Sequence, residues 1–215
     1  MAKSASERIN WVEGSITETF GLKRIYENFP LLNEWLKVEN NLTPLEISEL
    51  EKRRSILIRK YSSWNEETLK MKFVAFILDM VGYDTNEFEG VFDLELKGIV
   101  QNEKLSVIAD YVVAKVIFSL VKQPYFYFHE YKQSKKNKDP IDQILLAMLI
   151  AQEKNEKKFP LYGCAVIAEQ WFFMILDGKH YSVSIGHNAL GPKDLQEILL
   201  ILRKFKHILL TELAI

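Results

Sequence analysis

Residues 125–132 read YFYFHEYK, and the interpretation of the whole sequence starts from this stretch. Aromatic residues favour β-strands, and successive side chains of a strand point to opposite faces of the sheet. A strand here therefore places Glu130 and Lys132 on the same face as Phe126 and Phe128. The other face carries Tyr125, Tyr127, His129 and Tyr131. Two charged side chains thus leave the end of an apolar face together, where a charge is costly unless it is paired or binds a metal.

Asp110 supplies a second carboxylate in the preceding predicted strand, at 105–115. It lies in the run VIADY at 107–111, so an acidic side chain interrupts an apolar strand. If the two strands are neighbours, Asp110 lies opposite Glu130, and two carboxylates form an oxygen site suited to a hard cation such as Mg²⁺. Lys132 then lies one step away, where its ammonium can orient and polarise a water at that cation.

The elements on either side predict an α/β domain with a mixed sheet. Upstream, a capping box at 43–46 begins a helix that runs to about residue 61, and another helix spans about 65–81 and ends at Gly82. Alternation of apolar and polar residues at 92–97 predicts a further strand. Downstream we expect a helix at 140–154, a single strand near 161–176 that is straight or bent, a hairpin over Asp177-Gly178 to a strand at 181–185, and a final helix from about residue 192.

The first 62 residues are predicted to form an N-terminal helical extension, and residues 63–215 a single domain. Apolar residues between positions 20 and 32 recur at roughly helical spacing, interrupted by Pro30. All candidate site residues lie in the domain at 63–215, so the N-terminal extension has no assigned role.

The candidate residues resemble the motif of the PD-(D/E)XK nuclease superfamily, which has the restriction endonuclease-like fold. The match consists of Asp110, then Glu130-Tyr131-Lys132, then Gln143 at the start of the following helix. Gln143 begins the run QILLAM, which is similar to a pattern in relatives of the type I restriction enzyme nuclease domain. Glu66 stands at the position of the glutamate that the family carries in the helix before the first strand. The resemblance covers residues 63–186. It departs from the family motif at one position, because Ala109 stands before Asp110 where the motif has proline.

This resemblance implies metal-dependent hydrolysis of phosphodiester bonds in nucleic acid, as by a DNA endonuclease of restriction, defence or DNA-processing type. Asp110, Glu130 and the backbone carbonyl of Tyr131 would hold Mg²⁺, with Mn²⁺ as a substitute, and Glu66 would complete the site or support a second ion. Lys132 would orient the nucleophile, and Gln143 would fix the water or a phosphate oxygen. The lysine-rich loop at 132–138 would suit phosphate contacts beside this site.

Each candidate residue also has a purely structural interpretation. Asp110 and Lys132 can form an ion pair within the sheet. Glu66 can close a capping box with Ser63, which leaves Glu67 as the alternative metal ligand. Gln143 can be an exposed helix residue without further role.

A second E-x-K sequence shows how weak that motif is by itself. Glu95-Leu96-Lys97 follows Asp93, but its apolar neighbours Phe92, Leu94 and Leu96 alternate with the charges. We therefore interpret Asp93, Glu95 and Lys97 as a solvated strand face. His129 and His187 are interpreted as ordinary polar residues, and Cys164 as a small buried apolar residue.

Composition limits the class of protein. The chain has 215 residues, of which 48% are hydrophobic, so it can form a substantial core and wholesale disorder is excluded. With 28 Lys+Arg against 29 Asp+Glu, the net charge of -1 argues against strong non-specific electrostatic binding to nucleic acid of the kind that histones show. A single cysteine, and a sequence without an apolar signal or membrane-spanning run, predict a soluble cytoplasmic protein.

A competing hypothesis is a non-catalytic protein of the same fold that acts as a nucleic-acid-binding or protein-assembly module. A related hypothesis is a regulatory domain whose carboxylates pair only with lysines. The expected partners are DNA and possible further protein subunits, one of which would supply sequence recognition by docking on the N-terminal helices. An oligomer is compatible with the sequence. Metal binding through Asp110 and Glu130 discriminates between these hypotheses.

Overall fold

The computed structural model describes residues 11–118, 120–132, 139–156 and 158–213. Its helices are α1 (Glu13–Phe20), α2 (Pro30–Leu36), α3 (Pro44–Lys60), α4 (Glu66–Leu69), α5 (Ala75–Val81), α6 (Pro140–Lys154) and α7 (Pro192–Ile208), with a 3-10 turn η1 (Tyr61–Ser63) and π-helical segments η2 (Lys70–Val74) and η3 (Leu209–Leu213). Its strands are β1 (Lys23–Arg24), β2 (Phe88–Val100), β3 (Glu103–Ile117), β4 (Leu120–Lys132), β5 (Leu161–Ile167), β6 (Gln170–Asp177), β7 (His180–Val183) and β8 (His187–Asn188).

The described strands form one 8-stranded mixed sheet in the order β1-β7-β6-β5-β4-β3-β2, with β8 paired to β6. Pairing is parallel between β1 and β7 and between β4 and β5, and the other neighbouring strands are antiparallel. Helix α6 makes the crossover that a parallel β4–β5 pair requires. The prediction of an α/β fold with a mixed sheet flanked by helices is therefore confirmed.

Local sequence signals explain where two of the helices begin. At α3, Thr43 Oγ1 accepts a hydrogen bond from the Glu46 N–H, and the Glu46 carboxylate accepts one from the Thr43 N–H, so the predicted capping box is present. At α6, the Asp139 carboxylate accepts a hydrogen bond from the Ile141 N–H at 3.1 Å, and Pro140 occupies the first helical position.

The helix predicted at 65–81 is one helical run that contains a π-helical segment. It begins as α4, continues as η2 and ends as α5, with Gly82 at φ 66° as the left-handed terminator. A π-helical turn adds a residue to a helical turn, and such turns are frequent at functional sites. Period and capping predict the ends of this helix, but no residue pattern predicts the π-helical segment.

Two sequence expectations are wrong in detail. The apolar pattern between residues 20 and 32 is not one interrupted helix, because α1 ends at Phe20 and β1 adds to the sheet beside β7 before α2 begins. The stretch 161–176 is two antiparallel strands, β5 and β6, which reverse direction near Ala168, a residue with φ 53°.

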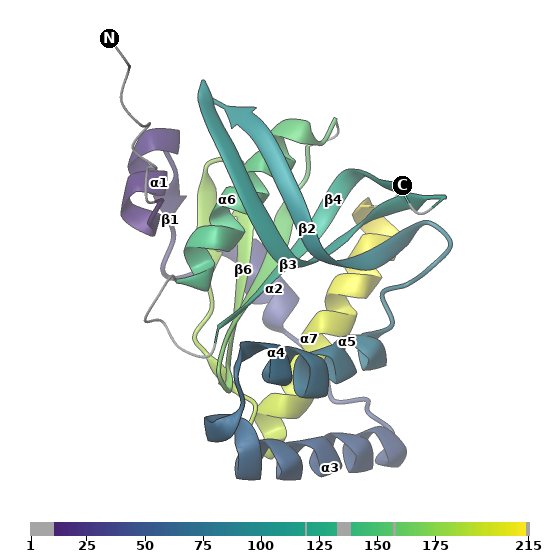
Figure 1. The fold of residues 1–215 in the computed structure, drawn as a ribbon. Coiled ribbons are helices and arrows are strands. Elements are labelled where there is room, and N and C mark those ends of the chain that lie inside the picture. The colour runs from purple at the N-terminus through teal and green to yellow at the C-terminus, as the bar shows by residue number, and fades with distance from the viewer. Residues whose placement is uncertain (1–10, 119, 133–138, 157, 214–215) are drawn as a thin grey trace.

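Helices cover both faces of the sheet (Figure 1), and each face has its own core. The α6-side core contains α1 and α6 with side chains such as Phe128, Ala165 and Met174. The α7-side core contains α2 to α5 and α7 with side chains such as Tyr127, Tyr131 and Trp171. Because both faces are buried, the central strands β4 and β5 carry almost continuous runs of buried residues.

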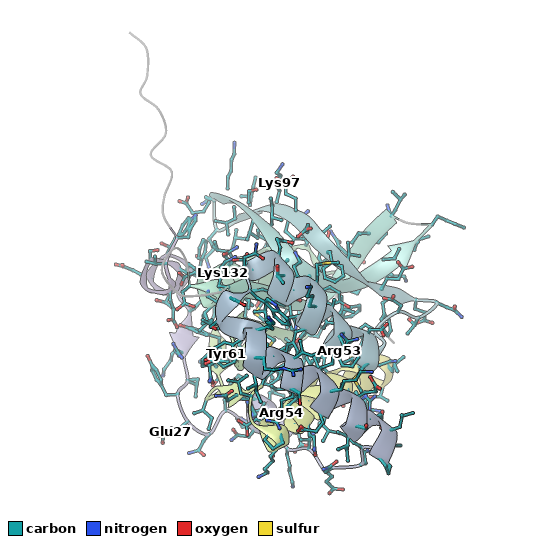
Figure 2. All side chains as sticks on the ribbon, turned by 60° about the horizontal axis from the view of Figure 1, so that its bottom comes forward. Glu27, Arg53, Arg54, Tyr61, Lys97 and Lys132 are labelled. Atoms are coloured by element: carbon teal, nitrogen blue, oxygen red, sulfur yellow. The ribbon has the colours of Figure 1, made fainter. Side chains whose placement is uncertain are left out.

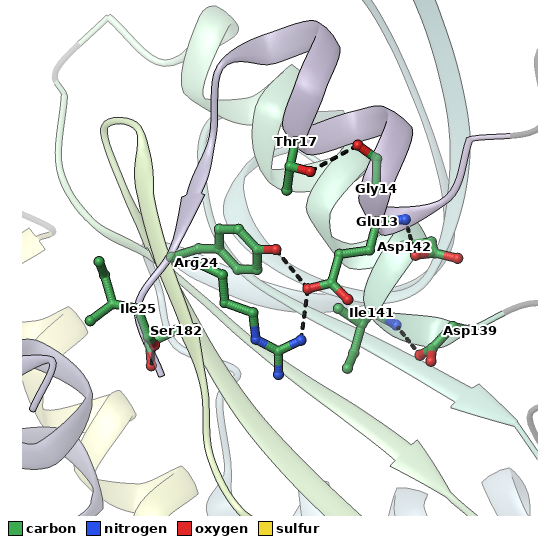
Figure 3. A network of polar contacts seen from close by, with 10 residues as sticks. Glu13, Gly14, Thr17, Arg24, Ile25, Asp139, Ile141, Asp142 and Ser182 are labelled. Atoms are coloured by element: carbon green, nitrogen blue, oxygen red, sulfur yellow. Dashed lines mark hydrogen bonds and ion pairs between the residues drawn. The ribbon is translucent and has the colours of Figure 1, made fainter. Parts of the chain in front are cut away.

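The segment before residue 63 is built into this same body. Glu13 of α1 accepts hydrogen bonds from Arg24 of β1 at 2.8 Å and from the Tyr181 hydroxyl of β7 at 2.6 Å (Figure 3). The Glu13 N–H donates to the Asp142 carboxylate of α6 at 2.7 Å. In α2, Trp35 is buried in the α7-side core. These helices thus pack on the core of residues 63–215, and whether either segment folds alone stays a prediction.

The predicted alternation along 125–132 holds only for the second half of the strand. The β3–β4 register shifts between Val113 and Lys115. As a result Phe126 packs in the α7-side core, together with Tyr127, while Tyr125 packs against the α6-side core. The expectation that Tyr125 shares a face with Tyr127 and Tyr131 is therefore wrong.

Within the part of the chain that the structure describes, we find no helix both long enough and apolar enough to cross a membrane. Cys164 is buried, as expected. The lysine-rich loop predicted to contact phosphate lies outside the described residues, apart from Lys132.

Candidate metal centre at Asp110 and Glu130

Asp110 and Glu130 lie on neighbouring strands, as the sequence predicts. The antiparallel register of β3 and β4 pairs Tyr111 with His129, which places Asp110 beside the end of β4. The Tyr131 N–H donates a hydrogen bond of 2.8 Å to Asp110 Oδ2, so a side chain continues the ladder of backbone bonds by one step. Asp110 is thereby fixed on the strand that carries Glu130 and Lys132.

Glu130 is a buried carboxyl group that lies against Asp110. The residue is 1% exposed, and among the described residues neither Oε1 nor Oε2 has a hydrogen-bond partner of regular geometry. Burial, followed by the charge of Asp110 and a contact between the two carboxyl groups, raises the pKa of Glu130 well above its ordinary value, whereas the charge of Lys132 and the backbone N–H of Asp110 oppose that rise. Buried polar groups are hydrogen-bonded in the great majority of cases, so a buried glutamate that lies against a second carboxyl group indicates protonation or a bound cation.

Lys132 pairs with Glu66. The Lys132 ammonium lies 3.1 Å from Glu66 Oε1, with the side chains 17% and 39% exposed. The capping interpretation of Glu66 is wrong, because Asn65 caps this helix by accepting a hydrogen bond from the Thr68 N–H. Glu66 is instead the first helical residue and contacts β4.

Asp110 pairs with Lys70, a residue that the sequence analysis did not single out. Lys70 Nζ lies 3.7 Å from Asp110 Oδ1 and 2.8 Å from Asp93 Oδ1. The proposed Asp110–Lys132 ion pair is not found among the described residues, where the two lysines take different carboxylates. Burial disfavours the Lys70 ammonium, but the Asp93 hydrogen bond and the charges of Asp110, Asp93 and Glu67 outweigh it and raise its pKa.

Asp93 is the second residue that sequence reasoning missed. Its side chain is exposed, as predicted for that strand face, and Glu95 and Lys97 beside it are exposed and paired with each other at 2.8 Å. However, Asp93 has φ 52° within β2, a conformation uncommon for a residue other than glycine. The one available signal was an aspartate in a strand, since Asp tolerates this conformation better than most residues.

The side-chain alternation of β3 reverses at Asp110. Val107 and Ala109 face the α6-side core, whereas Tyr111 and Val113 face the α7-side core, although all four have odd numbers. The β2–β3 pairing goes from Phe92–Tyr111 to Leu94–Ala109 and omits Asp93 and Asp110. The side-chain alternation of both strands therefore reverses at Asp93 and Asp110, the two aspartates that contact Lys70.

Gln143 stands on α6, which packs against β4, but it does not join the other candidates. No described hydrogen bond links it to Asp110, Glu130, Lys132 or Glu66. Its Oε1 atom is buried and has no hydrogen-bond partner among the described residues, so Gln143 is not the exposed helix residue of the structural interpretation. Its role in the site stays a prediction.

His129 lies on the face opposite Glu130 and is fully buried. Its Nε2 atom and the Tyr127 hydroxyl are 2.5 Å apart, and burial lowers the pKa of His129 to about 3. The interpretation of His129 as an ordinary polar residue, and not a metal ligand, stays a prediction.

The arrangement fits a divalent cation held by two carboxylates. The orphaned oxygens of Glu130, the Asp110 carboxylate and the Tyr131 carbonyl are hard oxygen donors, and Mg²⁺ commonly uses one or two carboxylates with water and phosphate oxygens. Among the described residues there is no group of three or more His, Cys, Asp or Glu side chains placed to hold a metal. Glu66 as a further ligand therefore stays a prediction.

Comparison with known proteins adds no identification. No protein-family model matches the chain, and no curated protein sequence matches it either. The fold established for the chain is thus the mixed α/β architecture described above, and what the site does has to be inferred from its own geometry.

Proposed function

We propose that this chain is a metal-dependent nuclease that hydrolyses phosphodiester bonds of nucleic acid, with DNA as its substrate, on a restriction endonuclease-like core. The observation that carries the proposal is Glu130, a carboxyl group 1% exposed that lies beside the carboxylate of Asp110 and, among the described residues, has no hydrogen-bond partner of regular geometry. A fold that needs only stability has no use for such a group, because an unsatisfied buried polar group is destabilising. Perturbed carboxyl groups of this kind are concentrated at functional sites.

In the proposed site, Asp110, Glu130 and the Tyr131 carbonyl hold Mg²⁺, or Mn²⁺ in its place. When bound, this ion supplies positive charge for a phosphate oxygen and lowers the pKa of water. Asp110 is already held in place by the Tyr131 N–H. Lys132, held by Glu66 at 3.1 Å, orients the attacking water and stabilises negative charge on the phosphate in the transition state.

The substrate and partners follow from charge. A net charge of -1 gives the chain little general attraction for DNA, so recognition is proposed to depend on local contacts and on a protein partner. Lys132 and the lysine-rich loop after it are the local cations nearest in sequence to the site. We expect the chain to act in the cytoplasm.

A second candidate function is a non-catalytic module of the same architecture. The specific observation in its favour is that Asp110 lies within 4 Å of Lys70 and Glu66 pairs with Lys132, so lysines balance two of the candidate carboxylates. Within the described part of the chain, Glu130 forms no ion pair with a lysine, which is why we favour the metal site.

The test is a cleavage assay on supercoiled plasmid, linear duplex and single-stranded DNA, with Mg²⁺ and with Mn²⁺. Wild type is compared with Asp110→Asn and Lys132→Ala. The matched control is the second E-x-K sequence, as Glu95→Gln and Lys97→Ala, because Lys97 is an exposed lysine that lies apart from Lys132 (Figure 2). We expect metal-dependent cutting in the wild type and both controls, and none in the two site variants.

Metal binding separates the roles of the two site residues. Lys132→Ala should still bind Mn²⁺ in a calorimetric titration, whereas Asp110→Asn should bind it at least about 10-fold more weakly. Undiminished turnover in Lys132→Ala contradicts the nuclease proposal. A wild-type chain that neither cuts DNA nor binds Mn²⁺ supports the non-catalytic alternative.

A further inference from the structure

Lys70 is a buried cation that the proposed reaction does not use. Its side chain is 6% exposed, yet its ammonium contacts carboxylates from two strands, Asp93 at 2.8 Å and Asp110 at 3.7 Å. The rings of Phe92 and Tyr131 lie 5.7 and 5.9 Å from Nζ, so aromatic faces surround the rest of the group. Lysine is rarely buried unless it is paired, and here the stronger pair is with the exposed residue Asp93.

Two irregular backbone segments bring these groups together. Lys70 is the first residue of the π-helical segment η2, and Asp93 has φ 52° within β2. Each irregularity costs free energy, and such features persist at sites where the surrounding structure and a function require them. Lys70 and Asp93, which belong to these two irregular segments, both lie near Asp110. We therefore take the position of the Lys70 ammonium to be a functional feature of this site.

The geometry sets Lys70 and a divalent cation in competition. Asp110 Oδ2 accepts the hydrogen bond of the Tyr131 N–H, and the Lys70 ammonium lies 3.7 Å from Oδ1, the oxygen without that hydrogen bond, where its charge opposes a cation bound to the same carboxylate. Two positive charges near one carboxylate repel each other, and little water is present to screen them because Lys70 and Glu130 are both buried. Asp93 draws the ammonium away from Asp110 by offering it a closer partner.

We propose that the Lys70–Asp93 pair sets the metal affinity of the Asp110–Glu130 site: Lys70 competes with the metal for Asp110, and Asp93 relieves that competition. The inference rests on the metal site of the proposed function. It assigns to Lys70 and Asp93 the role of positioning residues that act through Asp110.

The proposal predicts effects of opposite sign from two substitutions. Lys70→Gln removes the competing charge and should tighten Mn²⁺ binding by about 10-fold or more. Asp93→Asn leaves Lys70 with Asp110 as its main partner and should weaken Mn²⁺ binding by about 3-fold or more. Asparagine also tolerates positive φ, so the strand geometry is kept. Lys70→Arg retains a cation and should stay within about 3-fold of wild type, which separates charge from packing.

The experiment is a calorimetric titration of the full chain with Mn²⁺, without nucleic acid, with circular dichroism to confirm that each variant is folded. Lys97→Gln is the matched control, since Lys97 is exposed and paired with Glu95 on the same strand, and it should leave the affinity unchanged. Tighter binding in Lys70→Gln with weaker binding in Asp93→Asn supports the proposal, as does Mn²⁺ binding seen only in Lys70→Gln. Equal affinities in wild type and folded Lys70→Gln overturn it and leave the metal site standing. No Mn²⁺ binding in any variant overturns both.

Discussion

Oε1 of Glu66 lies 3.1 Å from Nζ of Lys132, although 66 positions separate the two residues in the chain. Glu66 is the first residue of α4, and Lys132 is the last residue of β4. A carboxylate near the start of a helix is also favoured by the helix dipole, so its orientation is defined from both sides. The pair joins the helix that precedes the sheet to the strand end that carries the candidate site.

Under the proposed function, Glu66→Gln should slow cleavage by about 10- to 100-fold, because the Lys132 ammonium loses the contact that orients it. The effect on stability should be small, about 0.2–1 kcal/mol, since the pair is partly exposed. Single-turnover cleavage rates and urea unfolding measure the two effects. Glu67→Gln serves as the neighbouring control, and a greater loss in Glu67→Gln would instead identify Glu67 as the functional acid.

Glu130→Leu should make the metal-free protein more stable, by about 1–3 kcal/mol, because it removes a buried carboxyl group that lies against a second carboxyl group, that of Asp110. The same variant should gain no stability from Mn²⁺, whereas the wild type should gain it by mass action. Urea unfolding with and without Mn²⁺ provides the measurement. Glu95→Gln, on the exposed face of β2, should change stability by less than about 0.5 kcal/mol. A destabilised Glu130→Leu would show that the carboxyl group has a structural partner.

Glu46→Gln tests the capping box of α3 through pH. The Thr43 N–H and hydroxyl, followed by Arg203, lower the pKa of Glu46 to about 2 in the folded chain. Since the ordinary value of 4.5 applies to the unfolded chain, the unfolded state binds more protons between these values, and the contribution of Glu46 is lost as the pH falls from about 4.5 to about 2.

At pH 7 the substitution should therefore cost about 1 kcal/mol, a discounted figure because the side chain is partly solvated. The difference between variant and wild type should shrink as the pH falls towards 2, as followed by chemical unfolding at several pH values. Glu49→Gln, on the same helix and exposed, is the control. A difference independent of pH contradicts the assignment.

Trp35→Ala tests whether the N-terminal helices are part of the fold. The ring is buried against Tyr127, Tyr162 and Phe173, and its N–H donates to the Ile201 carbonyl at 2.9 Å. We expect a loss of about 3–5 kcal/mol in the free energy of unfolding. Tyr26→Ala, at a position 78% exposed in the same segment, should cost far less. Equal effects of the two variants would mean that the segment is a loosely attached extension.

Much of the architecture could be predicted because local patterns specify it. The Thr43 capping box, the Gly82 terminator and the Asp177-Gly178 hairpin are encoded within a few residues, and the structure confirms them. The Asp110–Glu130 juxtaposition follows from the pairing of β3 with β4 as consecutive antiparallel strands, with Tyr111 opposite His129. The candidate roles of these residues stay predictions.

The parts that were missed depend on backbone geometry that residue patterns do not record. Lys70 lies in an amphipathic helix where a lysine is ordinarily solvated, and only the π-helical turn directs it to the sheet. Asp93 occupies a strand face that alternation marks as solvent-exposed, and only its positive φ allows it to reach Lys70. Period-two reasoning likewise fails for Tyr125, because it assumes a register without interruption.

The conformation of Asp93 also matters for self-association. Strand β2 is 13 residues long and lies at the end of the sheet order, so its outer backbone groups face no other described strand. Long, regular edges of this kind are templates on which a second copy can add a strand and start an aggregate. The break at Asp93 divides β2 into two shorter segments that face in different directions. The residue that pairs with the Lys70 ammonium therefore also interrupts the open edge of the sheet, so a long regular stretch of β2 is not presented to a second copy.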